Sequence, residues 1–117
     1  MSTVLIIDDD APFRGLARRM LAELGFAIVG EADSVESARD AAARLRPDAA
    51  LVDVMLADGD GVALAHDLAE LPWRPRVLLT STAPDAVSEE QLRSDGVLGF
   101  VAKEALPEAP LVELLGG

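Results

Sequence analysis

The stretch that decides the fold is VLIIDDDAP at residues 4–12, where four apolar residues run directly into three carboxylates. Consecutive apolar residues favour a strand buried on both faces, which is typical of parallel sheets. Two carboxylates about 4 Å apart repel each other by roughly 4 kcal/mol at an effective dielectric constant of 20. The stretch therefore predicts a parallel sheet, with carboxylates at the end of its first strand that hold either a proton or a cation.

The rest of the chain repeats this strand pattern and alternates it with helical patterns. Short runs rich in Val, Ile or Leu predict five strands, at residues 3–8, 27–32, 49–54, 76–81 and 98–103. Helical periodicity predicts five helices, at residues 11–24, 33–46, 61–71, 88–96 and 107–117, the last interrupted by Pro110. Right-handed crossovers then favour an α/β, flavodoxin-like (βα)5 fold, a doubly wound sheet of five parallel strands in the order 2-1-3-4-5 with helices on both faces. We expect residues 1–117 to form a single domain.

Local signals set the boundaries of two of these helices. Asp33 and Glu36 are spaced as a capping box at the start of the second helix. Ser88 and Gln91 have the same spacing at the start of the fourth helix, which we expect to end at Gly96. The first helix is expected to face the core with Phe13, Leu16, Ala17, Met20, Leu21 and Leu24.

Composition excludes several classes of function. The formal charge of −11 argues against binding of nucleic acid or an anionic membrane by this segment, because such contacts need clustered Lys and Arg. The absence of cysteine excludes disulfides, thiolate metal sites and thiol catalysis. No stretch resembles a signal peptide or approaches the roughly 20 apolar residues of a membrane helix. We therefore expect a cytoplasmic protein.

Polar residues follow the predicted strands and should meet at one edge of the sheet. The first strand ends in Asp8 and Asp9, the third in Asp53, the fourth in Thr80 and the fifth in Lys103. Ligands of doubly wound sheets bind at the carboxyl ends of the strands, where the strand order reverses. A few carboxylates with retained waters favour Mg²⁺ over Ca²⁺. A carboxylate can also act as a nucleophile toward phosphorus while a hydroxyl and an ammonium stabilise the phosphoryl oxygens, and Asp53 is the candidate nucleophile.

Taken together, these residues resemble the receiver domains of two-component response regulators. The resemblance covers essentially the whole chain and rests on four motifs: VLIIDDDAPFR at 4–14, ALVDVMLADGDG at 50–61, VLLTS at 77–81 and GFVAKEAL at 99–106. The KEAL segment is similar to the ending of receivers attached to helix-turn-helix DNA-binding domains. Such an output domain would lie beyond residue 117.

The resemblance implies a metal-dependent phosphoacceptor. Asp53 is expected to receive a phosphoryl group from the phosphohistidine of a sensor histidine kinase or from a phosphotransfer protein. Asp9, Asp53 and the backbone carbonyl of Met55 are expected to bind Mg²⁺ or Mn²⁺ directly, and Asp8 to position the metal, with water as the link. Phosphorylation would act as a switch, with a homodimer as one outcome, and the chain would not be an enzyme with an external product.

The resemblance also implies residues that read out phosphorylation. Thr80 and Lys103 match the residues that hold the phosphoryl group, and Phe100 matches an aromatic switch that moves inward when Thr80 moves toward the phosphate. Met55 and Thr82 match positions that influence dephosphorylation. An apolar Met55 beside the phosphoryl group should hinder the attacking water, which predicts a moderately long-lived phosphorylated form.

Three features depart from the family pattern. Glu104 follows Lys103 where many members have a proline in a cis peptide, so the geometry of that bond is left open. Ala57 replaces the usual loop proline, which predicts a more mobile loop. The region 83–96 matches poorly, so the output surface is not assigned.

Two other functions remain as alternatives. A pseudo-receiver would keep the fold as an interaction module without being phosphorylated. A haloacid-dehalogenase phosphatase also forms an aspartyl phosphate, but it needs a second Asp two residues after the first, where this chain has Met55.

Other charged features are assigned to structure rather than to function. DGDG at 58–61 lacks the later ligands of an EF-hand calcium loop and is interpreted as a turn. Asp10 is interpreted as a cap or solvated neighbour of the first helix. His66, followed by Asp67, is expected on an exposed helical face. Solvated helix faces are also expected for Arg14, Arg18, Arg19, Arg44 and Arg46.

Overall fold

The computed structural model describes residues 2–93 and 97–116, and its centre is a five-stranded sheet in which every pair is parallel. The strands of this sheet are β1 Thr3–Ile7, β2 Ala27–Ala32, β3 Ala49–Asp53, β6 Arg76–Ser81 and β7 Val97–Ala102. Their spatial order is β2-β1-β3-β6-β7. Because β6 and β7 are the fourth and fifth strands of the sheet along the chain, this order confirms the prediction of 2-1-3-4-5.

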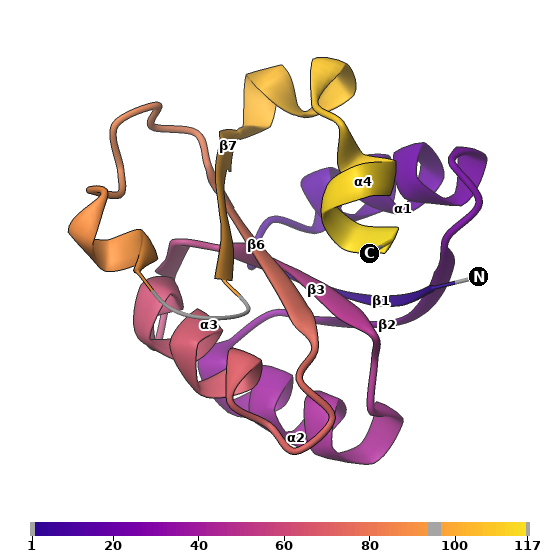
Figure 1. The fold of residues 1–117 in the computed structure, drawn as a ribbon, viewed down its shortest axis with the longest axis horizontal. Helices are drawn as coiled ribbons and strands as arrows, with labels where there is room; N and C mark the ends of the chain where they lie inside the picture. The colour runs from indigo at the N-terminus through magenta and orange to yellow at the C-terminus, as the bar shows by residue number, and fades with distance from the viewer. Residues whose placement is uncertain (1, 94–96, 117) are drawn as a thin grey trace.

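Helices cover both faces of the sheet (Figure 1). The α-helices are α1 Ala11–Glu23, α2 Val35–Leu45, α3 Gly61–Ala69 and α4 Leu111–Gly116. Two 3₁₀ segments are also present: η1 Glu90–Leu92 lies between β6 and β7, and η2 Lys103–Glu108 lies between β7 and α4. Buried residues of α1 and α4 belong to one core cluster and those of α2 and α3 to another, on opposite sides of the sheet. None of the helices in the described residues has the length and hydrophobicity needed to cross a membrane.

The core is aliphatic and is divided by the sheet. Along β1, Leu5 and Ile7 join the cluster under α2 and α3, while Val4 and Ile6 join the cluster under α1 and α4. All four side chains are buried. The uninterrupted apolar run at the start of the chain therefore reflects burial on both faces, as predicted.

The apolar stripe of α1 is narrower than predicted. Ala17 and Leu21 are fully buried, but Leu16 is 54% exposed and Leu24 is 44% exposed. Leu24 is the C-cap, so it falls beyond the last helical turn. Leu16 lies one position, about 100° around the helix, from the buried Ala17. The prediction that both leucines face the core was wrong.

The second helix begins one residue later than the predicted capping box. Ser34 is the N-cap, and its hydroxyl accepts a hydrogen bond from the Ser37 amide at 3.0 Å. The Ser34 amide in turn donates to the Ser37 hydroxyl at 3.1 Å, so the box is formed by two serines rather than by Asp33 and Glu36. Asp33 instead accepts a hydrogen bond from the Ser37 hydroxyl at 3.1 Å.

The predicted fourth helix is reduced to one 3₁₀ turn, η1, in the described residues. The capping box itself is present, because the Ser88 amide donates to the Gln91 side chain at 2.8 Å and the Gln91 amide to the Ser88 hydroxyl at 3.3 Å. This segment packs only Val87 and Leu92 against the core. Helices depend largely on the packing of an apolar face, so a cap alone does not extend this one. The predicted terminator, Gly96, lies outside the described residues.

Several charged side chains make contacts that the sequence did not predict. Arg14 and Arg18 both pair with Glu31, and the Arg46 guanidinium lies 4.4 Å from the centre of the Trp73 ring. Arg18 and Arg46 are nevertheless exposed, as expected, whereas Arg14 is half-buried, so its assignment to a solvated face was wrong. Asp10 occupies the N-cap position of α1, although its side chain makes no capping hydrogen bond. His66 also differs from its expected exposed position, because its Nε2 atom lies 2.6 Å from the carbonyl oxygen of Gln91 and joins α3 to η1.

Candidate functional site

Three aspartates converge where β1 and β3 end. Ile7 of β1 lies in register with Val52 of β3, so the residues that follow them emerge side by side. Asp8 and Asp53 are buried and Asp9 is exposed, and carboxylate oxygens of all three lie within 4.8 Å of one another. The structure thus brings together the acids that the sequence placed at this edge of the sheet.

Lys103 lies against two of these acids. Its Nζ atom is 2.8 Å from Asp8 Oδ2 and 3.4 Å from Asp53 Oδ2, and 4.2 Å from the centre of the Phe13 ring. Burial by itself lowers the pKa of Lys103, but the neighbouring Asp8 and Asp53 carboxylates outweigh it and the pKa is raised. Lys103 is therefore an ammonium at neutral pH. Its peptide bond to Glu104 is trans, like the other peptide bonds of the described residues.

The acidic cluster has the properties of a site for a hard divalent cation. Asp8 Oδ2 is buried and receives no hydrogen bond of regular geometry from the described residues, although it faces Lys103. All the converging donors are carboxylate oxygens, the ligands that Mg²⁺ and similar ions prefer. The residues present therefore fit such an ion, and which of them bind it stays a prediction.

The surroundings of Asp53 disfavour the ionised form of its carboxyl group. Burial raises the pKa of the Asp53 carboxyl, and the nearby Asp8 charge raises it further, while the Met55 amide and Lys103 act in the opposite direction. The Met55 amide donates to Asp53 Oδ1 at 3.1 Å, which places the backbone of Met55 beside the cluster. The Met55 side chain itself is 67% exposed.

Thr80 lies next to Asp53 in the sheet, but its hydroxyl is engaged elsewhere. Asp53 and Thr80 are partners in the register of β3 with β6, and Thr80 pairs with Val101 of β7. The buried Thr80 hydroxyl donates to the Val101 carbonyl at 2.7 Å. Phe100, next to Val101, is half-buried against the core under α2 and α3. Thr82 is exposed in the loop that follows β6.

The loop after Asp53 forms a small antiparallel hairpin, β4 Met55–Leu56 and β5 Gly59–Asp60, that the sequence did not predict. Asp58 ties this hairpin to α2, because its carboxylate accepts hydrogen bonds from the Val35 amide at 2.8 Å and the Glu36 amide at 3.2 Å. The Val35 hydrogen bond is the main cause of the lowered pKa of Asp58. The loop around Ala57, which lacks the family's proline, is therefore held by hydrogen bonds between Asp58 and the start of α2.

Asp60 confirms the interpretation of DGDG as a turn before α3. Its Oδ1 accepts a hydrogen bond from the Val62 amide at 2.8 Å, which makes it the N-cap of that helix. The first helical residue, Gly61, packs so closely that an added Cβ atom would lie 1.9 Å from the Asp53 carbonyl oxygen. The sequence analysis did not single out Gly61, and the available signal was the Asp60-Gly61 pair at the start of α3.

Comparisons with known proteins agree with this fold. The family model described as "Response regulator receiver domain" matches residues 4–115. The DNA-binding transcriptional activator DevR/DosR of Mycobacterium tuberculosis is 35% identical over 106 residues, which are 89% of this chain and 48% of that protein. The transcriptional regulatory protein PdtaR of the same species is 35% identical over 101 residues, or 86% and 48%. The chain thus spans about half the length of these curated relatives.

Solved structures show the same architecture. The signal receiver domain of a modulated diguanylate cyclase from Desulfovibrio desulfuricans G20 aligns with a TM-score of 0.81 and 30% identity, over 98% of this chain and 93% of that one. A CheY-like response regulator receiver domain from Methylobacillus flagellatus aligns with a TM-score of 0.83 over 97% of both chains. The second pair is only 21% identical, so it supports the fold alone.

Proposed function

The chain belongs to the receiver domain family of response regulators, and from this we propose that it accepts a phosphoryl group on Asp53 in a metal-dependent reaction and so switches its surface. The observation that carries the proposal is the convergence of Asp8, Asp9 and Asp53 with the Lys103 ammonium between two of them. This arrangement puts a nucleophilic carboxylate beside a fixed positive charge, as phosphoryl transfer requires.

The proposed metal is Mg²⁺ or Mn²⁺. Asp9, Asp53 and the carbonyl of Met55 would hold it directly, and Asp8 would orient it through water. When bound, the cation supplies positive charge that offsets the negative charge of the carboxylates and of the phosphoryl oxygens. The convergence of three carboxylates within 4.8 Å supports this assignment.

In the proposed reaction, an Asp53 carboxylate oxygen attacks the phosphorus of a phosphohistidine. The new O–P bond forms as the P–N bond breaks, and the electron pair leaves with the imidazole nitrogen. Lys103 would exchange its contact with Asp53 for a phosphoryl oxygen, because its Nζ atom already lies 3.4 Å from Asp53. An ammonium in this position favours the transition state because charge develops on those oxygens.

The switch would begin at Thr80. Its hydroxyl now donates to Val101, and it would have to release that carbonyl to donate to a phosphoryl oxygen on the neighbouring Asp53. Phe100 lies next to Val101 on the same strand and would move inward at the same time. Phosphorylation would thus bias an equilibrium between two arrangements of β6 and β7.

The relatives suggest how the switch is used. Two are named as a transcriptional activator and a transcriptional regulator, and this chain matches about half of each. We therefore propose that residues 1–117 act as one receiver domain whose partner is a sensor histidine kinase or phosphotransfer protein. Its output would be a DNA-binding domain beyond residue 117, with a phosphorylation-dependent homodimer as an intermediate. The proposed chemistry is limited to the protein's own phosphorylation and dephosphorylation.

Intact mass spectrometry of the wild-type protein tests this function. Incubation with acetyl phosphate and Mg²⁺ should add the mass of one phosphoryl group, and EDTA should abolish the gain. Beryllofluoride with Mg²⁺ should change the NMR signals of residues around Asp53. If neither reagent has an effect, the chain is a pseudo-receiver that retains the pocket without its chemistry.

Met55→Asn should shorten the lifetime of the phosphorylated protein by about two- to thirteenfold, because one hydrogen bond that positions the attacking water contributes about 0.5–1.5 kcal/mol. The exposed Met55 side chain follows Asp53 by two residues and offers water no such bond. The decay of the phosphorylated mass after removal of the phosphodonor measures this effect. Met55→Leu is the control, since it keeps an apolar side chain and should decay like wild type. Equal decay of the Asn variant and wild type would contradict the prediction.

A further inference from the structure

Two acids of the site, Asp8 and Asp9, lie on a very short connection. β1 ends at Ile7 and α1 begins at Ala11, so only Asp8, Asp9 and Asp10 join them. The Asp8 amide donates to the Ala32 carbonyl of β2 at 2.9 Å, which continues the pairing of β1 with β2. Beyond that amide the chain leaves the sheet, and other contacts must set its direction.

Arg14 supplies one of those contacts. Its Nη1 atom donates a hydrogen bond to the carbonyl oxygen of Asp8. This carbonyl and the amide of Asp9 share one planar peptide group, so holding the carbonyl also fixes the direction in which Asp9 leaves. The Asp9 side chain is exposed, and the backbone on either side of it therefore determines where its carboxylate lies.

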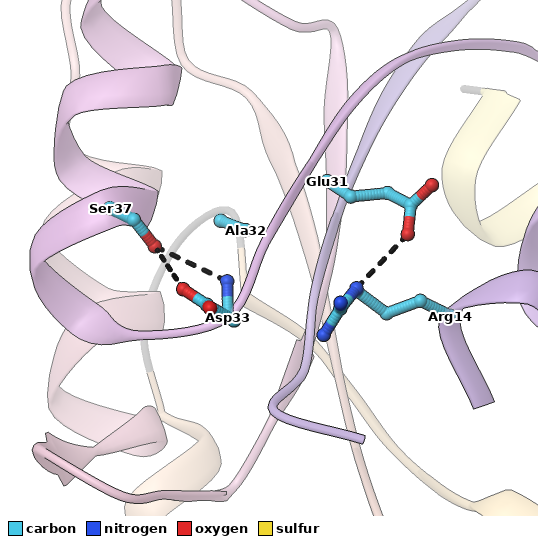
Figure 2. A pocket seen from close by; sticks show the side chains of 5 residues that line it. All are labelled: Arg14, Glu31, Ala32, Asp33 and Ser37. Carbon is cyan, nitrogen blue, oxygen red and sulfur yellow. Dashed lines mark hydrogen bonds and ion pairs between the residues drawn. The ribbon is translucent and has the colours of Figure 1, made fainter. Parts of the chain in front are cut away.

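Arg14 is itself held in place by β2. Its Nε atom donates to Glu31 Oε1 at 3.0 Å, and Arg18 binds the other oxygen of the same carboxylate at 2.9 Å. Figure 2 shows Arg14 and Glu31 facing each other in a pocket of about 220 Å³, with Asp33 and Ser37 on its other side. Burial raises the pKa of Glu31, but the Arg18 and Arg14 guanidinium groups outweigh it, and the lowered pKa keeps the carboxyl ionised at neutral pH.

The two arginines differ in a way that separates their roles. Arg14 contacts both Glu31 and the Asp8 carbonyl, and its side chain is only 17% exposed. Within the described residues Arg18 hydrogen-bonds to Glu31 but not to the Asp8–Asp10 loop, and its side chain is 44% exposed. A guanidinium is suited to the first role because its donors form a rigid fork that reaches two acceptors at once.

We propose that Arg14 is a positioning residue for the metal site: anchored on Glu31, it fixes the Asp8–Asp9 peptide and so places the Asp8 and Asp9 carboxylates for a divalent cation. This inference deepens the proposed function and rests on it. Groups outside the ligand set that orient metal ligands typically change metal affinity by about 10- to 100-fold when they are removed. Arg14 differs from the usual case because it acts through the backbone of the ligands.

The test is calorimetric titration of Mg²⁺ into wild type, Arg14→Gln, Arg14→Lys and Arg18→Gln. Arg14→Gln should weaken Mg²⁺ binding by about 10-fold. Arg14→Lys should weaken it as well, because an ammonium keeps the charge but cannot span both acceptors. Arg18→Gln, the matched control, removes the same charge from the same ion-pair cluster and should bind Mg²⁺ like wild type.

Two further readouts separate positioning from a general loss of structure. Thermal unfolding in EDTA should show that each variant is folded at the titration temperature. At saturating Mg²⁺, phosphorylation of Arg14→Gln by acetyl phosphate should return to the wild-type rate, because the defect lies in metal affinity.

The outcomes distinguish this inference from the proposed function. Wild-type affinity in Arg14→Gln, full rescue by Arg14→Lys, or equal losses in Arg14→Gln and Arg18→Gln would each overturn the role of Arg14 while leaving the phosphoacceptor proposal intact. A wild-type protein that binds no Mg²⁺ would overturn the proposed function and this inference together.

Discussion

Asp53→Asn is expected to abolish phosphorylation by acetyl phosphate and, in metal-free buffer, to raise the free energy of unfolding by about 1 kcal/mol. The first effect follows if Asp53 is the nucleophile, because the side-chain amide of asparagine cannot replace the carboxylate in attacking the phosphorus atom. The second follows from repulsion, since two carboxylates about 4 Å apart repel by roughly 4 kcal/mol at an effective dielectric constant of 20 and Lys103 offsets only part of this. Clustered carboxylates without a bound cation thus destabilise the folded protein.

The pH dependence of that difference has a definite sign. The pKa of Asp53 is raised in the folded protein, mainly by burial and further by Asp8, so its charge destabilises the fold wherever the carboxyl is ionised. This penalty is fully present above the folded pKa and disappears as the pH falls below the unfolded pKa. The stability advantage of Asp53→Asn over wild type should therefore shrink as the pH is lowered from neutral into the acidic range.

Chemical denaturation in EDTA and in Mg²⁺, together with intact mass, measures these effects. Mg²⁺ should stabilise wild type more than Asp53→Asn, because the variant lacks one of the proposed ligands. Asp10→Asn is the matched control, since Asp10 is exposed at the same end of the sheet and its side chain makes no capping hydrogen bond. It should be phosphorylated like wild type. An Asp53→Asn protein that gains a phosphoryl group, or that is less stable than wild type in EDTA, would contradict the prediction.

The sequence predicted the sheet well because its signal is continuous. A strand buried on both faces is apolar over consecutive positions, as β1 is from Val4 to Ile7 and β3 from Ala49 to Val52. The convergence of Asp8, Asp9 and Asp53 could be predicted for the same reason, since parallel strands end at one edge and their order follows from a few topological rules. Their spacing in the sequence alone gives no such information.

The predictions that failed concern contacts between residues far apart in the sequence, which the hydrophobic periodicity does not reveal. Arg14 looks like any solvated helical arginine until β2 brings Glu31 beside it, and its bond to the Asp8 carbonyl depends on the path of a three-residue loop. Asp58 binds amides 22 and 23 residues away. The prediction of a helix from residue 88 failed differently, because in the described part, residues 88–93, the capping box formed without an apolar face that would extend a helix.

Gly61→Ala is expected to lower the free energy of unfolding by about 3 kcal/mol, at the upper end of the usual cost of overpacking a core. An added Cβ atom would lie 1.9 Å from the Asp53 carbonyl oxygen and 2.8 Å from the Val54 Cα atom. Both atoms belong to the backbone, so no rotamer change relieves the clash. The start of α3 must move away from β3, and the hydrogen bond from the Gly61 amide to the Val54 carbonyl, 2.9 Å long, moves with it.

The same displacement should slow phosphorylation, because the clash falls on the residue that we propose as the nucleophile. A shift of about 1 Å in a reacting group can reduce a rate by about 100-fold, so the acetyl phosphate reaction should fall by that order even where the variant is folded. Gly15→Ala is the matched control: Gly15 lies inside α1, a Cβ atom there meets nothing within 4 Å, and alanine should stabilise the helix by about 0.5–1 kcal/mol. If Gly61→Ala were as stable and as readily phosphorylated as wild type, the close packing of α3 against Asp53 would not be what holds the phosphoacceptor in place.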